Sequence, residues 1–178
     1  MIIVDTHCHA GLTKYEPVES LLRHMETSGV DQAVLIQYMG NTDNGYLVDC
    51  LARFPGKLAA AMIVPQEDDG SAVRRWAERG IQGIRLRPDA RAAAADPMAQ
   101  WRAADEEGLV VSAPSRPEWL LSAQFAEVTD TFPDLRIVII TGYPTRLEDF
   151  EGADDLLQKP FSLDELVGRV RKALDRAP

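Results

Sequence analysis

Residues 2–9 read Ile2-Ile3-Val4-Asp5-Thr6-His7-Cys8-His9, an apolar run that ends in His-x-His. The pattern predicts a buried strand over Ile2–Thr6 that delivers two imidazoles to its carboxyl end. Because side chains two residues apart on a strand point to the same side, we expect Asp5, His7 and His9 to face one pocket. Two neutral imidazoles at that spacing can bind one divalent ion. The alternative is that both histidines cap the strand and hydrogen-bond to loop backbone.

A short apolar strand followed by a helix recurs seven times along the chain. Alternation of this kind predicts an α/β fold with right-handed crossovers and a parallel sheet. Ligands of such sheets bind at the carboxyl ends of the strands, where the two histidines are expected. The predicted strands are Ile2–Thr6, Gln32–Gln37, Lys57–Val64, Gln82–Arg87, Leu109–Ala113, Arg136–Thr141 and Asp155–Lys159.

The predicted helices carry apolar stripes at helical spacing. His24 lies off the stripe of the first helix and is expected to be exposed, whereas Cys50 lies on the stripe of the second and is expected in the core. The last helix is predicted to begin at a capping box, Ser162-Leu163-Asp164-Glu165. The fifth helix is predicted to follow Pro117 and to bury four apolar side chains, Leu120, Leu121, Phe125 and Val128.

The composition is that of an ordinary globular protein. The chain has 178 residues, 46% hydrophobic and 26% charged, which favours a single α/β domain over residues 1–178. Its net charge of −9 argues against nucleic acid or a membrane surface as a partner. Cys8 and Cys50 are the only cysteines, so we expect no disulfide framework and a cytoplasmic location. No signal peptide is expected, and no apolar run approaches the roughly 20 residues of a membrane span.

Four segments share the order and spacing of a known family, namely Val4–His9, Gly80–Pro88, Trp101–Gly108 and Phe132–Ile139. Over residues 1–139 the chain therefore resembles the amidohydrolase-related (amidohydrolase 2-like) family, which comprises metal-dependent hydrolases and decarboxylases built on a (β/α)8 TIM barrel. The resemblance implies a hydrolase of a small anionic carbonyl substrate. It also implies Zn²⁺ or another divalent metal at His7 and His9, and no nucleotide cofactor.

The family pattern includes further ligands that this chain lacks. Histidines are implied after strands five and six, and an aspartate after strand eight. Here strand five ends in Ser112-Ala113-Pro114-Ser115 and strand six in Thr141-Gly142-Tyr143. The whole sequence has only three histidines, His7, His9 and His24. Because catalytic zinc usually takes three protein ligands, we expect low metal occupancy and a weak or inactive enzyme.

Residues 140–178 resemble a different family. The segments Ile140–Tyr143 and Gly152–Ser162 are similar to the C-terminal part of a response-regulator receiver domain. In that family a threonine and a lysine at the positions of Thr141 and Lys159 help to bind a phosphoryl group on an aspartate. The strand expected to carry this aspartate, Leu109–Ser112, has none, so we expect no phosphotransfer. The chain is thus predicted to be a composite, amidohydrolase-like over residues 1–139 and receiver-like over residues 140–178.

Four basic or hydroxyl side chains are predicted to lie at the carboxyl ends of the strands, together with the histidines. They are Arg85, Arg87, Thr141 and Lys159. Such a rim suits a small carboxylate or phosphate, held through charge-assisted hydrogen bonds. The alternative is that the two arginines pair with neighbouring acids such as Asp5 and Asp89.

The predicted fold is an incomplete TIM-barrel-like α/β protein of seven βα units, with flavodoxin-like or receiver-like C-terminal units. That is one unit short of the usual barrel. Either the seven strands close imperfectly, or the sheet stays open and its edge favours a homo-oligomer. Two functions are compatible with these residues. One is a weak or inactive amidohydrolase-like hydrolase, and the other is a non-catalytic composite scaffold with degenerate hydrolase and phospho-receiver sites.

Overall fold

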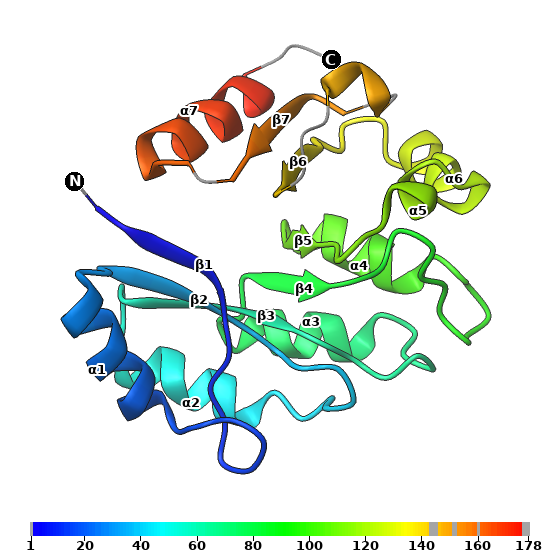
Figure 1. The fold of residues 1–178 in the computed structure, drawn as a ribbon. Coiled ribbons are helices and arrows are strands. Elements are labelled where there is room, and N and C mark those ends of the chain that lie inside the picture. Colours follow the sequence, from blue (N-terminus) through cyan, green and yellow to red (C-terminus); the bar gives the residue numbers. More distant parts are fainter. Residues whose placement is uncertain (1, 143–145, 151–152, 160, 176–178) are drawn as a thin grey trace. The chain divides into compact units, whose positions relative to one another are not determined.

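Figure 1 shows the computed structural model of the chain, which describes residues 2–142, 146–150, 153–159 and 161–175. The backbone forms two compact units, one over residues 2–114 and one that begins at Ser115. Each unit is built from parallel strands and helices, so the predicted α/β class is confirmed. No described helix is long and apolar enough to cross a membrane.

The first unit contains a five-stranded parallel sheet in the order β1-β2-β3-β4-β5 (Figure 1). A strand order that follows the sequence is typical of a (β/α) barrel, whereas doubly wound sheets reverse their order at one point. The unit is therefore an incomplete barrel, as predicted. The strands are β1 (Val4–Cys8), β2 (Gln32–Ile36), β3 (Leu58–Met62), β4 (Gly83–Arg85) and β5 (Val110–Ser112).

Four helices connect these strands, each following one strand and preceding the next. On the first helix His24 is exposed, and on the second Cys50 is fully buried, as their positions relative to the apolar stripes predict. The first helix ends at Gly29, whose φ of 68° is a left-handed conformation that glycine adopts without strain. The helices are α1 (Val18–Ser28), α2 (Gly45–Arg53), α3 (Ser71–Glu78) and α4 (Ala99–Glu106).

Strand β1 starts and ends two residues later than predicted, and it contains a register shift. Asp5 pairs with Ala33 and Cys8 with Leu35, so β1 spans three residues where β2 spans two. The extra residue is the mark of a β-bulge, which interrupts the alternation of side chains between the two faces. His7 is exposed and Cys8 is buried, as expected for neighbouring residues on opposite faces of a strand.

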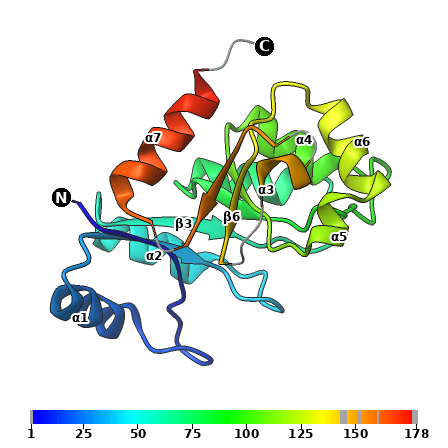
Figure 2. The same ribbon diagram turned by 45° about the horizontal axis from the view of Figure 1, so that its top comes forward.

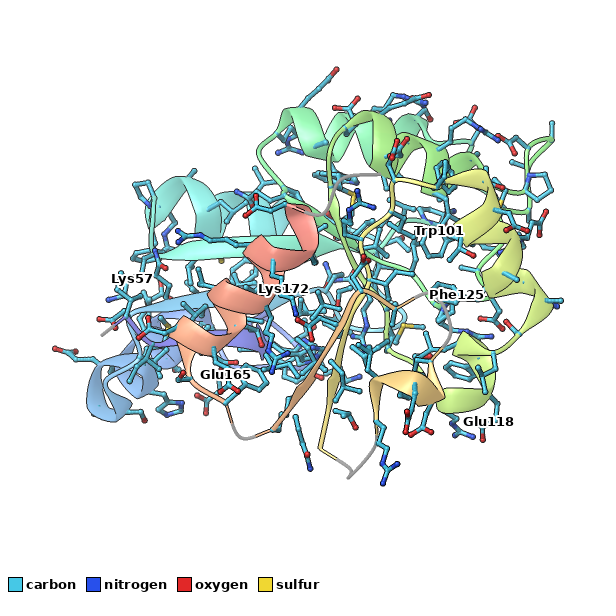
Figure 3. The ribbon with its side chains drawn as sticks, turned by 90° about the horizontal axis from the view of Figure 1, so that it is seen from above. Lys57, Trp101, Glu118, Phe125, Glu165 and Lys172 are labelled. Atoms are coloured by element: carbon cyan, nitrogen blue, oxygen red, sulfur yellow. The ribbon has the colours of Figure 1, made fainter. Side chains whose placement is uncertain are left out.

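The core of the first unit lies between the sheet and its helices. Strand β3 reads Leu-Ala-Ala-Ala-Met, and all of its residues except Ala59 are buried. Trp101 of α4, labelled in Figure 3, is buried, and its indole N–H donates to the carbonyl of Ala90 (3.0 Å). This hydrogen bond gives the N–H group of the buried indole the partner that it needs away from water. The largest fully buried apolar side chains of this unit include Leu35, Leu47, Met62, Ile81 and Ile84.

The second unit contains a parallel pair of strands, with Thr141 at the end of the first paired to Gln158. Its last helix packs against both strands, which Figure 2 shows from a second angle. The buried carboxylate of Asp155 accepts a hydrogen bond from the guanidinium of Arg169 (2.7 Å), which ties that helix to the second strand. The elements are α5 (Pro117–Leu120), α6 (Ala123–Thr131), β6 (Val138–Thr141), η1 (Leu147–Asp149), β7 (Asp155–Gln158) and α7 (Leu163–Leu174).

The structure corrects one prediction about a helix. The predicted fifth helix is two helices, because the Ser122 hydroxyl accepts the backbone N–H of Phe125 (3.2 Å) and starts α6. Serine in this capping position interrupts the helix that precedes it. Leu121, predicted to be buried, lies in the break and is 63% exposed, whereas Phe125 and Val128 are buried as predicted.

The structure also corrects the prediction of one continuous parallel sheet. The described strands form one sheet of five and another of two. Strand β5 has only three residues and is followed by Pro114 and Pro117. Because proline has no N–H to donate to a ladder, the chain leaves the five-stranded sheet at this point.

Candidate functional site

The candidate site lies at the carboxyl end of β1 and β2, in the first unit. His9 follows the last residue of β1, and its Nδ1 lies 2.6 Å from the carbonyl oxygen of Ile36, the last residue of β2. A carbonyl oxygen can only accept, so Nδ1 carries the proton in this bond. In the neutral ring, Nε2 is then the unprotonated nitrogen. That nitrogen is the one available to take up a proton or to bind a metal.

The two histidines of the His-x-His stretch are brought together. Their ring centres lie 5.2 Å apart with an angle of 88° between the planes. In a tetrahedral zinc site with Zn–N bonds of about 2.0–2.1 Å, two imidazole centres also lie about 5 Å apart. The same spacing is ordinary for an edge-to-face ring pair. Asp5 does not join them as a free carboxylate, because its Oδ1 accepts the backbone N–H of His7 (3.0 Å).

Two tyrosines and a lysine stand beside His9. The ring of His9 stacks on Tyr15 with 4.6 Å between centres and 23° between planes, and Tyr15 contacts Tyr38 at 5.5 Å. The Lys14 ammonium lies 5.1 Å from the centre of the Tyr38 ring and 5.7 Å from that of Tyr15. Both distances are within the range of a cation–π interaction. The stacking on Tyr15 fixes the plane of the imidazole, and Lys14 adds a positive charge beside the two tyrosine rings.

A buried polar network supports the end of β2. Gln37 and Asn44 are both buried, and the Gln37 amide donates to the carbonyl of Asp43 (2.9 Å) and to the Asn44 side chain (3.3 Å). Asn44 in turn donates to the backbone of Ile63 (2.9 Å) beyond the end of β3. Buried amides that are satisfied in this way hold loops in one conformation. The network therefore fixes the ends of two strands relative to each other.

Arg85 approaches the same strand end from β4. Its Nη1 donates to the carbonyl of Gln37 (3.3 Å), the residue after the one that binds His9. Its Nε is buried and has no hydrogen-bond partner among the described residues. Such an unpaired guanidinium nitrogen costs free energy unless an acceptor reaches it. The structure thus brings an imidazole and a guanidinium to consecutive carbonyl groups of one strand end.

Arg87 does not share the environment of Arg85. It lies beyond the end of β4, and its guanidinium forms a two-pronged ion pair with Asp89 (Nε to Oδ1 2.9 Å). This hydrogen bond is the main cause that raises the pKa of Arg87 and lowers the pKa of Asp89. The pairing with Asp89 is the alternative that the sequence left open for this arginine.

Thr141 and Lys159 belong to the second unit. Thr141 is the last residue of β6 and Lys159 directly follows β7, and the backbone N–H of Lys159 donates to the carbonyl of Thr141 (2.7 Å). The Lys159 side chain is exposed. The structure therefore brings the backbones of these two residues together in the second unit, whereas the two histidines and the two arginines belong to the first.

The donors at the candidate site do not complete a metal centre. No group of three or more His, Cys, Asp or Glu side chains within the described ranges could hold a metal ion. Cys8 lies between the histidines, but its thiol donates to the carbonyl of Val34 (3.3 Å). Burial, with a contribution from Asp5, raises the pKa of that thiol to about 12. A thiol that keeps its proton is a poor metal ligand, so two imidazoles remain.

Sequence reasoning did not single out the residues around His9. Tyr15, Tyr38, Gln37 and Asn44 come from loops or strand ends rather than from a motif. A signal was present for one of them, because Gln37 is a polar residue that directly follows the apolar run of β2. The tyrosines gave no such signal, since their contact depends on the conformations of two loops.

Comparison with known proteins gives one family match. The model of a family described as amidohydrolase matches residues 4–149, which runs past residue 139 into the segment predicted to be receiver-like. No curated protein sequence matches the chain.

Solved structures share the fold at low sequence identity. A probable 2-pyrone-4,6-dicarboxylic acid hydrolase from Acinetobacter baumannii, crystallised with citric acid, is 20% identical over 79% of this chain with a TM-score of 0.64. A TatD homologue from Escherichia coli K12 is 18% identical over 83% of the chain (TM-score 0.52). The 5-carboxyvanillate decarboxylase from Sphingomonas paucimobilis is 12% identical over 78% of the chain (TM-score 0.52). The chain spans 58%, 62% and 67% of the lengths of these proteins, in the same order.

Proposed function

The chain belongs to the amidohydrolase family, and from that premise we propose that it is a hydrolase of low activity that acts on a small anionic carbonyl compound. Two of the structurally similar proteins are named for substrates that carry carboxylate groups, a pyrone dicarboxylate and a carboxyvanillate. The proposal transfers that class of substrate to this chain. It predicts a carboxylate-binding group and a proton-transfer group at the same strand end.

The observation that carries the proposal is the anchoring of His9 and Arg85 on consecutive carbonyl groups. His9 is held by Ile36 and Arg85 by Gln37. The guanidinium of Arg85 uses only its Nη1 for the carbonyl of Gln37, so its other terminal nitrogen retains N–H donors for a carboxylate. The unprotonated Nε2 of His9 can act as a general base towards water or towards the substrate.

A divalent metal such as Zn²⁺ would be held by His7 and His9, and it would supply polarisation of the substrate carbonyl. Two ligands are fewer than the three protein ligands that catalytic zinc usually has. The proposal therefore assigns proton transfer to His9 in the metal-free site, because an Nε2 that bound a metal could not also act as the base, and it attributes the low activity to the incomplete ligand set.

The second unit is proposed to bind a separate small anion. Thr141 ends β6 and Lys159 follows β7, and their side chains carry a hydroxyl and an ammonium group. This arrangement supports the proposed receiver-like character of residues 140–178. Since no third ligand accompanies the histidines among the described residues, the same facts favour an alternative function, a non-catalytic composite scaffold in which both sites have degenerated.

The test compares two arginines of one strand region. Citrate and 2-pyrone-4,6-dicarboxylate serve as probes, with binding measured by isothermal titration calorimetry and hydrolysis by loss of pyrone absorbance. Arg85→Gln is expected to weaken binding about 10- to 100-fold, the effect of losing one charge-assisted hydrogen-bonded pair. Arg87→Gln is the matched control and should change binding less than about threefold, because Arg87 is already paired with Asp89.

His9→Gln separates binding from chemistry. It should leave the affinity for citrate within about threefold and remove hydrolysis, since glutamine has no basic nitrogen. Absence of binding by the unmodified protein, or equal losses in both arginine variants, would refute the hydrolase proposal. Binding without any hydrolysis would instead support the non-catalytic scaffold.

A further inference from the structure

Two cationic side chains lie at the carboxyl end of β1 and β2 without an acid to neutralise them. The ammonium of Lys14 lies over the rings of Tyr38 (5.1 Å) and Tyr15 (5.7 Å). The Nη1 of Arg85 donates to the carbonyl of Gln37 (3.3 Å). Neither cation forms an ion pair with a carboxylate of the described residues. Both therefore retain a positive charge that a ligand can neutralise.

Three consecutive residues at the end of β2, residues 36–38, connect these cations with the proposed base. The carbonyl of residue 36 accepts the proton of His9, and that of residue 37 accepts from Arg85. The ring of Tyr38 lies beside Lys14. Consecutive Cα atoms are only about 3.8 Å apart, so an imidazole, a guanidinium and an ammonium gather around one short piece of backbone.

The loop that carries Lys14 is held in place from two sides. The backbone N–H of Gly11 donates to the carbonyl of Glu16 (2.9 Å), which closes the loop, and Tyr15 stacks on His9 (4.6 Å between ring centres). The Lys14 side chain itself is exposed. A ring attracts an ammonium through its electron-rich face, and the ammonium has three N–H donors. Lys14 is therefore both positioned by its neighbours and accessible to an anion.

We propose that Lys14 binds a second carboxylate of the substrate while Arg85 binds the first, so that the site selects dicarboxylates over monocarboxylates. The inference rests on the hydrolase proposed above and specifies its substrate. The net charge of −9 repels a dianion more strongly than a monoanion. A dianion thus needs both cations at the site, whereas a monoanion needs only Arg85. Lys14 binds substrate and takes no part in proton transfer, which stays with His9.

The test compares two ligands that differ by one carboxylate, 2-pyrone-4,6-dicarboxylate and 2-pyrone-6-carboxylate. Isothermal titration calorimetry of the unmodified protein should show about 10-fold tighter binding of the dicarboxylate, the effect of one charge-assisted pair at an exposed position. Lys14→Met should remove this preference. It should weaken binding of the dicarboxylate only and leave the affinity for the monocarboxylate within about twofold, because the monocarboxylate is held by Arg85.

The chain offers a rescue variant and a matched control. Lys14→Arg keeps a positive charge over the two rings and should retain the preference for the dicarboxylate. Lys57, labelled in Figure 3, is an exposed lysine directly before β3, at the opposite end of the parallel strands. Lys57→Met removes the same charge and should leave both affinities unchanged. Arg85→Gln should weaken binding of both ligands.

The outcomes separate this inference from the proposed function. Equal losses for the two ligands in Lys14→Met, or the same loss of preference in Lys57→Met, would overturn the role of Lys14 and leave the hydrolase proposal standing on Arg85 and His9. Absence of binding of both ligands by the unmodified protein would overturn both. A preference that depends on Lys14, found without hydrolysis, would support the inference and reject only the hydrolase activity.

Discussion

Replacing Asn44 with alanine is expected to destabilise the first unit more than almost any other polar substitution. Asn44 is completely buried. Its amide nitrogen donates to the carbonyls of Thr42 (3.1 Å) and Ile63 (2.9 Å), and its oxygen accepts from the Ile63 N–H and the Gln37 amide, both at 3.3 Å. Alanine removes all four bonds at once. The backbone groups of Ile63 then lose their partner at the end of β3.

The magnitude follows from these contacts. Each hydrogen bond contributes about 0.5–1.5 kcal/mol net, and the two bonds of 3.3 Å belong at the lower end. The sum is about 3–4 kcal/mol, a large part of the roughly 5–15 kcal/mol that stabilises an ordinary domain. With a urea m-value of about 1–3 kcal/mol per molar, the unfolding midpoint should fall by at least about 1 M.

The assay is urea unfolding followed by tryptophan fluorescence, to which Trp76 and Trp101 of the first unit and Trp119 of the second contribute. Asn41→Ala is the matched control. Asn41 is only partly buried, accepts one backbone N–H from Asp43 (3.0 Å) and contacts Gln37 at 3.4 Å. Its loss should cost no more than about 1.5 kcal/mol. Equal midpoints for the two variants would show that the buried network does not hold the strand ends together.

Two further predictions concern the sheet and the thiols. Gly83→Ala should lower the free energy of unfolding by about 1–3 kcal/mol, because the new Cβ would lie 2.9 Å from the Val110 carbonyl oxygen. Gly168→Ala should instead raise the free energy of unfolding by about 0.5–1 kcal/mol in the same denaturation assay, because a Cβ on this residue of α7 would enter open space. Burial raises the pKa of Cys8 to about 12 and of Cys50 to about 11. The folded chain thus keeps two protons that the unfolded chain loses above about pH 9. The free energy of unfolding should therefore be unaffected by the thiols below that pH, and it should fall by up to about 1.4 kcal/mol per pH unit for each thiol as the pH rises above it.

These predictions have simple contradicting outcomes. If Gly83→Ala and Gly168→Ala shift the midpoint in the same direction, the close approach at β4 does not limit stability. For the thiols, the comparison is with the Cys8→Ala/Cys50→Ala variant between pH 9 and 11. A loss of stability that is equally steep in both proteins would show that other groups cause it.

Most of the strand pattern could be predicted from the sequence because it depends on local apolar runs. Each of the seven predicted strands is present, from β1 to β7, although most are shorter than predicted. The bulge in β1 could not be predicted, since it reflects a mismatch with β2 rather than a property of either segment. The break at Ser122 had a local signal, but the apolar residues around it also suit one continuous helix.

The candidate site was predictable only in part. His7 and His9 stand in a motif, so their proximity followed from spacing alone. Arg85 and Arg87 look equivalent in the sequence, yet one reaches the backbone of β2 and the other pairs with Asp89. The difference arises because β4 ends at Arg85, so the rule that residues two apart share a side does not extend to Arg87.

The carbonyl groups that anchor His9 and Arg85 belong to the main chain of residues 36 and 37. Every amino acid carries a carbonyl there, so no single substitution at either position deletes the anchor. A saturation mutagenesis screen would therefore score these two positions only for their side chains and would overlook their contribution to the site. Detecting that contribution requires a change in the backbone itself, such as replacement of the peptide bond by an ester or thioamide through chemical synthesis.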